Sequence, residues 1–394
     1  MRTRRTLGRR TCGCVVSLLT TMSLACPLVA HAQDVPPTEN PPTTAPSPAP
    51  TEPSTTPEAP DAGSPTSTPS AEKAAVDDER EKKDEGGERK IKDHVFIFPA
   101  FVTTSIIASY VGVRMQLGTR SISGLPTEAG RIDIETVTFA QGLDGGIKIT
   151  DWLGLAATGA VRSLVGSNLQ ALVYDGATYD FGGIGSVIVR LFRSDRTGSQ
   201  LSLIGTAGYS KGQVASLLPL VDQPVQAVVD LLRRELGESI KTPFSTITYG
   251  GRLAYAQSIS PLFGVQASAG LGGSTFTLEP YNRDTDTRAS STTTEVTYNV
   301  GVAPSVDFMP LGVPLAIMPE YLLARTASSA TVRGAGDFDT IHQLVAGAYY
   351  SGRKTLQLGL IWAAQLGQRG LQTPQGQSDS PTQQSGQLVL RYVW

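Results

Sequence analysis

The sequence predicts an all-β protein: a transmembrane, antiparallel, up-and-down β-barrel of about 12 strands, preceded by a disordered segment. Three observations predict this fold. After about residue 110, apolar residues alternate with polar or small residues over most of the chain, and a period of two is typical of β-strands. The connections between these segments are alternately short and long. Aromatic residues gather near both ends of the segments, where rings would meet two membrane interfaces.

The composition excludes several classes of protein. The chain has 394 residues and a net charge of −2, so no basic surface points to nucleic acid. Its three cysteines, Cys12, Cys14 and Cys26, all lie near the N-terminus. A mature chain without that stretch has no thiol, which excludes a disulfide framework and a cysteine-based metal site. No metal-ligand spacing and no phosphate-binding loop stands out, so we expect no cofactor.

Residues 1–32 have the layout of a secretory signal peptide. An arginine-rich start is followed by an apolar segment from about Cys12 to Ala30, and Ala30-His31-Ala32 is a small-x-small cleavage site. We therefore predict a mature chain that starts at Gln33. Two other interpretations are weaker: Arg4-Arg5 resembles part of a twin-arginine signal, and 23–26 resembles a lipoprotein box that lacks its usual aliphatic residue.

Residues 33–93 are predicted to form a periplasmic linker. The first part, to about residue 71, is dominated by Pro, Thr, Ser, Glu and Ala, and it cannot bury enough apolar area to offset its conformational entropy. The second part, from Glu72 to Asp93, is densely charged with both signs. The linker is either a solvated spacer or a docking arm for a periplasmic or cell-surface protein partner.

The barrel domain is predicted to span 94–394 and to open with an uncharged run from Val95 to Val113. A run of this length also fits a transmembrane helix. Its proline, glycine and β-branched residues, and the period of two that continues to Leu117, favour a strand instead.

Connection lengths give the predicted topology. Short turns are predicted at 150–152, 193–198, 258–261, 309–314 and 351–353. Long connections are predicted at 118–131, 166–178, 211–244, 277–292, 327–336 and 367–385. Five short and six long connections separate twelve strands, an even number that puts both termini at the short-turn end.

The last eight residues, 387–394, have an apolar face that ends in Tyr392 and Trp394. This segment resembles the closing strand of bacterial outer-membrane β-barrel (porin-like) proteins. The resemblance implies a Gram-negative outer membrane, contact with its lipid, both termini in the periplasm, and recognition of the strand ending at Trp394 by the barrel-assembly machinery. We predict that this strand pairs with the segments 108–117 and 356–366, with Arg391 facing the lumen at the periplasmic mouth.

Charged residues occur on the predicted inward faces of the strands. Eight of them are candidates for the lining of a pore: Arg114, Lys148, Arg162, Arg190, Arg252, Glu295, Asp307 and Arg391. They would act either as solvated, mutually paired charges or as a charge-graded wall that selects solutes.

A catalytic interpretation of Gly208-Tyr209-Ser210-Lys211-Gly212 has little support. The motif fits the G-x-S-x-G pattern of α/β-hydrolases, and His342 lies downstream. A hydrolase needs this serine on a strand-to-helix turn of a parallel sheet, whereas the surrounding strands alternate as in an antiparallel sheet. We expect Ser210, His94 and His342 to be non-catalytic and the protein not to be an enzyme.

The longest connection, 211–244, carries a helical pattern. Asp222 can cap a helix, Pro224 suits its first turn, and Gly237 can end it. Such a helix would pack on the outer loops, fold inward as a lid or constriction, or bind a partner.

Two functions follow from the sequence. One is a porin-like channel for small polar solutes, which the polar, small-residue inward faces favour. The other is a structural or adaptor subunit of a cell-envelope complex that docks through the linker or through 211–244. The linker favours the adaptor, because a simple pore does not need one.

Overall fold

The computed structural model describes residues 89–127, 130–174, 176–217, 240–282, 287–328, 338–370, 372–373 and 376–394. The predicted signal peptide and most of the predicted linker lie outside these residues, as does the helix predicted between Asp222 and Gly237. Within the described ranges, no helix combines the length and the apolar character needed to cross a membrane.

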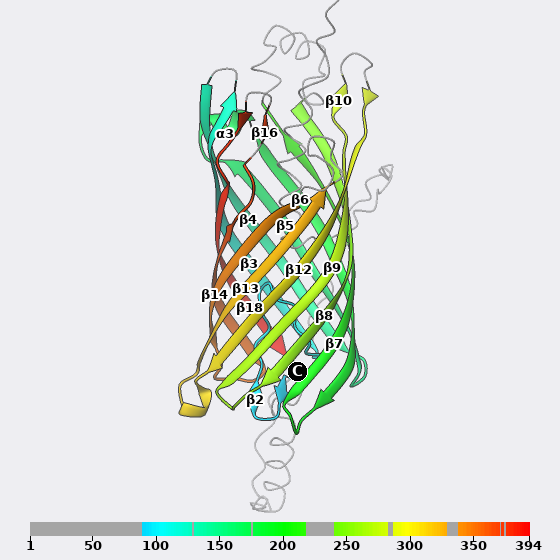
Figure 1. Ribbon diagram of the computed structural model, residues 1–394, viewed down its shortest axis with the longest axis vertical. Helices are drawn as coiled ribbons and strands as arrows, with labels where there is room; N and C mark the ends of the chain where they lie inside the picture. The colour runs from blue at the N-terminus through cyan, green and yellow to red at the C-terminus, as the bar shows by residue number, and fades with distance from the viewer. Residues whose placement is uncertain are drawn as a thin grey trace, which may run out of the picture. The chain divides into compact units, whose positions relative to one another are not determined.

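Twelve antiparallel strands form a closed barrel, which confirms the predicted fold class (Figure 1). The strands are β3 (Tyr110–Thr127), β4 (Gly130–Lys148), β5 (Leu153–Gly166), β6 (Ala177–Ser194), β7 (Ser199–Ala215), β8 (Lys241–Ser258), β9 (Phe263–Leu278), β12 (Ser291–Asp307), β13 (Leu315–Ser328), β14 (Phe338–Tyr350), β15 (Leu356–Leu366) and β18 (Thr382–Val393). Consecutive strands of this set are neighbours in the wall, so the chain runs up and down around the barrel.

The closing strand lies where the sequence predicted it. β18 pairs with β3 from Thr382 opposite Ser121 to Val393 opposite Tyr110, and its other edge pairs with β15. Because both edges are paired, the backbone groups of β18 are satisfied inside the wall, as a hydrocarbon environment requires.

The five predicted short turns are all present and lie at one end of the barrel, which we call the short-turn end. The turn between β12 and β13 contains a 3-10 helix, η1 (Met309–Leu311), which ends at Gly312 with φ of 81°. The opposite end carries the small elements α3 (Leu169–Tyr174), β10 (Tyr281–Asn282), β11 (Thr287–Arg288), β16 (Gln372–Thr373) and β17 (Gly376–Gln377).

Two predicted long connections are shorter than expected. The segment 118–131 is not a loop, because β3 and β4 continue as one hairpin to Thr127 and Gly130. A register shift between Ile122 and Leu125 accommodates Gly124, whose φ is 62°. This bulge interrupts the alternation of residues and so hides the strand from sequence reasoning. In the same way, β7 and β8 extend to Ala215 and from Lys241, into the predicted loop 211–244.

Side chains alternate across the wall as the sequence predicted. In β18, the outward residues Leu388, Leu390 and Tyr392 are 41–52% exposed, whereas the inward Val389 and Arg391 are at most 5% exposed. Large apolar side chains are exposed in the same manner on all the other wall strands. The outside of the barrel is therefore an apolar surface that suits lipid contact.

The first part of the predicted barrel domain is not part of the wall. The first wall strand starts at Tyr110, and residues 96–109 have no regular secondary structure. They follow a small hairpin of β1 (Lys90–Ile91) and β2 (His94–Val95). We call residues 89–109 the plug segment, because they lie inside the barrel at the short-turn end (Figure 1). The uncharged run from Val95 to Val113 is therefore a wall strand only from Tyr110 onward, close to the start of the segment 108–117 that was predicted to pair with the closing strand.

Candidate functional site: a lumen with an internal plug

The plug segment enters at the short-turn mouth of the barrel. Arg89 donates a hydrogen bond to the carbonyl of Lys354, in the turn between β14 and β15. Arg193, at the turn between β6 and β7, donates to the carbonyl of Lys90 at 3.0 Å. The hairpin of β1 and β2 is thereby fixed to turns on different sides of the mouth.

Beyond the hairpin, the plug segment builds an apolar core inside the lumen. Ile97 and Val102 pack with inward residues of β12, β13, β14, β15 and β18. Phe96, Phe98 and Ile106 pack with Ala256 and Val393, while Ile107 packs with residues of β6, β7 and β8. Burying apolar surface in this way is the main favourable term in folding, so it explains why the run 95–113 is uncharged.

One buried carboxylate holds the innermost bend of the plug segment. Glu320 of β13 accepts the backbone N–H groups of Ala100 at 2.6 Å and of Phe101 and Val102 at 2.9 Å each. Three consecutive N–H groups on one carboxylate replace the hydrogen bonds that regular secondary structure would supply. Glu320 is 3% exposed, so these bonds are shielded from water.

Inward amides and hydroxyls satisfy further backbone groups of the plug. Gln357 pairs with Phe98, donating to its carbonyl at 3.1 Å and accepting its N–H at 3.2 Å. Gln266 donates to the carbonyl of Ile97 at 2.7 Å, and Ser202 donates to the carbonyl of Ser105 at 2.7 Å. The short-turn half of the lumen is therefore a packed interior, with polar groups placed to match an irregular chain.

His94 lies at the base of the plug with no exposed surface. Its Nδ1 is 3.0 Å from the carbonyl oxygen of Pro261, and its Nε2 is 3.0 Å from Ser305 Oγ. Burial lowers the pKa of the His94 imidazole below its usual 6.5, and the hydrogen bond with Pro261 and the charge of Asp307 oppose this only in part. The neutral ring donates from Nδ1 to the Pro261 carbonyl and accepts at Nε2. Burial and the nearby Arg391 likewise lower the pKa of Arg89, to about 10.

Arg391 connects the plug, the closing strand and the neighbouring wall. Its Nε donates to Asp144 Oδ2 of β4 at 2.6 Å, and its guanidinium lies 5.5 Å from the ring centre of Phe98 and 5.8 Å from that of Tyr110. Both charged side chains are at most 6% exposed. The prediction that Arg391 faces the lumen is confirmed, but it lies beneath the plug core instead of lining open water.

The other predicted lining residues lie at different levels. Arg252 donates to Thr103 Oγ1 in the plug at 2.8 Å, and Lys148 pairs with the exposed Asp151 in a turn at 2.8 Å. Asp307 is buried at the end of β12, where it accepts the N–H of Met309, and Arg190 lies near the short-turn end of β6. Glu295 is buried farther from that end, on β12. These residues do not come together in one ring, and their role as a pore lining stays a prediction.

Arg114 and Arg162 lie beyond the plug, where the inner wall becomes polar. Arg162 donates to Asp180 Oδ2 through both Nε (2.9 Å) and a terminal nitrogen (2.8 Å). The two arginines border a recess in the inner wall, with Asp144, Asp180 and four glutamines nearby. A lumen with two chemically different halves, one apolar and filled, the other polar, is thus the candidate site.

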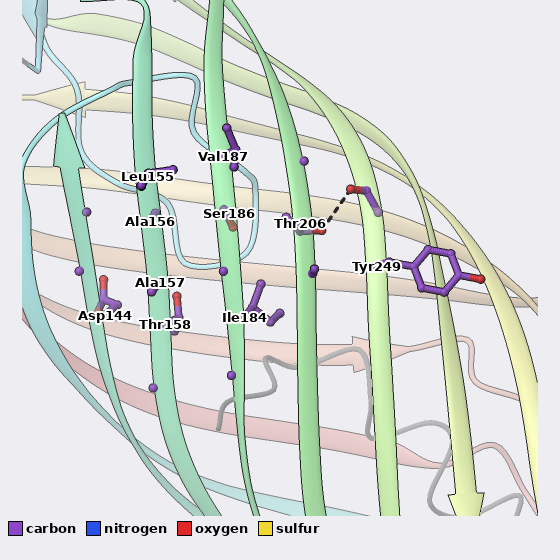
Figure 2. A pocket seen from close by; sticks show the side chains of 18 of the residues that line it. Asp144, Leu155, Ala156, Ala157, Thr158, Ile184, Ser186, Val187, Thr206 and Tyr249 are labelled. Atoms are coloured by element: carbon purple, nitrogen blue, oxygen red, sulfur yellow. Dashed lines mark hydrogen bonds between the residues drawn. The ribbon is translucent and has the colours of Figure 1, made fainter. Parts of the chain in front are cut away.

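On one side of the barrel, the wall is built from small residues. Small residues face each other on adjacent strands, with Gly145 opposite Ala157, Ala157 opposite Gly185, and Gly185 opposite Ala207. A hollow of about 1650 Å³ lies against them, and most of its lining side chains point outward. Figure 2 shows Leu155, Ala156 and Ala157 along one strand and Ser186 and Val187 on the next, with the hydrogen bond from Thr206 to the Gly250 carbonyl dashed.

An apolar exterior, a closed twelve-stranded wall and polar groups turned inward together decide the class of the molecule. The described residues form a β-barrel of the transmembrane type. No protein-family model and no curated protein matches its sequence. Among solved structures, it resembles the translocator domain of autotransporter NalP from Neisseria meningitidis, with 11% identity and a TM-score of 0.44 over 82% of this chain and 98% of that one.

Two further solved structures resemble this barrel. The beta domain of the Bordetella autotransporter BrkA has 13% identity and a TM-score of 0.42, covering 73% of this chain and all of that chain (100%). The Pseudomonas putida toluene transporter TodX has 8% identity and a TM-score of 0.34, covering 73% and 89%. Likenesses at this level concern the barrel fold alone.

The serine motif of the barrel lies in the middle of a strand. Ser210 of β7 is opposite Gly182 and Thr246, is 5% exposed, and points inward. The strand-to-helix turn that a hydrolase nucleophile needs is absent at this position. His342 is 2.8 Å from the hydroxyl of Tyr321 on the neighbouring strand β13.

Sequence reasoning missed the plug and the residues that hold it. A signal was present in the inward positions near the short-turn end, which are apolar where a water-filled lumen would carry polar residues. These positions are Ile188, Ile204, Met318, Val345 and Ile361, all at most 9% exposed.

Proposed function

We propose that this barrel is a channel for small polar solutes that the plug segment closes. The observation that carries the proposal is that the twelve wall strands close on one another and the plug segment contributes no strand to the wall. β18 and β3 pair over their common length, and the plug segment joins the wall only where Ser109 leads into Tyr110. The plug can therefore leave the lumen while the barrel stays closed, with no strand edge exposed to lipid.

The inner wall beyond the plug supports passage of polar solutes. It carries Thr136, Thr138, Asp180 and Thr246 as buried polar residues facing the interior. Twelve strands enclose a lumen wider than that of an eight-stranded barrel, which side chains alone can fill. In the proposed orientation, the barrel lies in a Gram-negative outer membrane. The short turns and both termini are periplasmic, and the assembly machinery binds the strand ending at Trp394.

Planar-bilayer recording tests the channel. The mature full chain should be mostly closed. A variant that lacks residues 89–107 should conduct steadily, and Glu320→Gln in the full chain should open more often than wild type. A deletion of residues 40–80 leaves the plug intact and serves as the control, which should stay closed. Folded barrels are identified by their heat-dependent migration on gels. The proposal fails when folded barrels of both plug variants carry no current.

A second candidate is an adaptor that the plug anchors in the membrane. The first described residue, Arg89, is bound at the short-turn mouth, and the plug segment that follows it is held in the short-turn half of the lumen. Residues 33–88, which precede Arg89, would bind a periplasmic protein partner. Affinity capture from envelope extracts should recover the same partner with the full chain and lose it with the 40–80 deletion. Equal recovery with both proteins would contradict the adaptor.

A further inference from the structure

We infer that the recess in the inner wall beyond the plug binds an uncharged polyhydroxy solute, such as a small sugar or polyol. The inference rests on the proposed channel and names the class of solute it would take. The recess is bordered by residues of six adjacent wall strands, from β15 through β18, β3, β4 and β5 to β6.

The base of the recess is made of small residues. Ala140 and Gly142 of β4 lie beside Ala160 of β5. A Cβ at Gly142 would lie 2.9 Å from the Gly159 carbonyl oxygen and 3.3 Å from the Ala160 Cβ, so a larger residue does not fit there without displacement. The space open to water-sized groups is about 50 Å³. Since one water needs about 10–15 Å³ by this measure, the recess admits several hydroxyl-sized groups.

The charges around the recess cancel. Arg114 and Arg162 at the recess and Arg391 next to it carry three positive charges, which the negative charges of Asp144, Asp180 and the nearby Glu320 balance. Arg162 is bonded to Asp180 at 2.8 Å, and Asp144 is bonded to Arg391 at 2.6 Å. A cation or an anion entering this site would lose hydration without meeting an uncompensated charge, so the balance favours a neutral solute.

Two polar atoms at the recess have unused hydrogen-bonding capacity. Among the described residues, Asp144 Oδ1 has no hydrogen-bond partner, although the side chain is only 3% exposed. Gln365 Nε2, across the recess on β15, also has no partner among them. One atom accepts and the other donates. A hydroxyl group does both, whereas an ammonium or a carboxylate satisfies only one of them. A solute with several hydroxyl groups thus satisfies both atoms.

Saturation-transfer NMR with D-glucose on the refolded full chain tests this site without requiring transport. Wild type should give a saturable signal. Gln365→Leu removes the free donor and should weaken binding about tenfold, the effect of losing about 1.4 kcal/mol. Ala140→Leu fills the recess and should abolish the signal. Gln343→Leu is the matched control, because Gln343 lies opposite Gln365 on β14 and does not line the recess, and it should bind within about twofold of wild type.

The outcomes separate this inference from the channel. A signal that does not saturate, or that survives unchanged in both Gln365→Leu and Ala140→Leu, overturns the sugar site whatever the bilayer recordings give. Displacement of glucose by sodium acetate at equal concentration also overturns it, because the charge balance then fails to exclude anions. Saturable glucose binding to a barrel that never conducts leaves the site intact and removes the channel.

Discussion

Replacing Glu320 with glutamine should loosen the plug segment by about 2–4 kcal/mol. The carboxylate accepts three backbone N–H groups, of which Phe101 and Val102 share Oε2 and Ala100 uses Oε1. Glutamine keeps one acceptor oxygen. With that oxygen in the Oε2 position, the Ala100 N–H faces an amide donor and is left unsatisfied, which costs about 1–3 kcal/mol. The two remaining bonds change from charge-assisted to neutral, a loss of about 1 kcal/mol each. Removing a buried charge recovers part of its desolvation cost, which brings the total down.

Hydrogen exchange of the folded barrel measures this loss. At 1.4 kcal/mol per factor of ten, 2–4 kcal/mol raises the opening equilibrium of the plug about 30- to 700-fold. Peptides that cover residues 96–105 should exchange faster by that factor, while β18 peptides should not change. Glu295→Gln is the control, because Glu295 is another buried, inward glutamate, opposite Ser274 and Ser328 of the neighbouring strands. Exchange of 96–105 within about threefold of wild type in Glu320→Gln would refute the role given to this carboxylate.

Three further perturbations test the plug and the closure of the wall. His94 has a pKa below 6.5 in the docked plug, so docking is fully stable above pH 6.5 and weakens as pH falls toward the docked pKa. After correction for the intrinsic exchange rate, which itself falls at low pH, the opening of 94–98 should be greater at pH 5 than at pH 7.5, and His94→Gln should flatten that rise. Gly264→Ala places a Cβ about 2.6 Å from His94 Nε2. The variant should increase hydrogen exchange of the β1–β2 hairpin while the barrel still folds. Unchanged exchange would contradict the close packing of His94 against Gly264. Arg391→Met leaves Asp144 buried and unpaired, and it should lower the free energy of unfolding in urea by about 3–5 kcal/mol. Adding Asp144→Asn should largely restore that free energy. Equal losses in the single and the double variant would argue against a stabilising ion pair.

Much of the wall could be predicted from the sequence, because its signal is local. Outward Leu388 and Leu390 alternate with inward Val389 and Arg391. Five of the connections between strands are short turns, which can be recognised in the sequence. The pairing of 387–394 with the first strand followed from closure alone. The bulge at Gly124 could not be predicted, since one extra residue changes the phase of the pattern without changing the composition.

The site was less predictable, because it depends on register and on an irregular chain. Arg162 and Arg391 were placed inward, but their partners Asp180 and Asp144 follow from which residues lie across the ladder. The plug has no period, and extended residues such as Ile106 and Ile107 carry the same β-branched composition as a strand. Only the match between an apolar segment and apolar inward positions could have identified it.

The apolar half of the lumen connects the two proposed functions. When the plug leaves, residues such as Ile204, Met318 and Ile361 face water, as do Phe96 and Phe98 of the plug itself. Each large apolar side chain exposed in this way costs about 1.5–3 kcal/mol, so the docked state is strongly favoured without any outside influence. Such a channel opens appreciably only when something stabilises the released plug or acts on the chain that leads to Arg89. A partner bound to residues 33–88 would do both, so an adaptor role for this segment would also be the means of opening the channel.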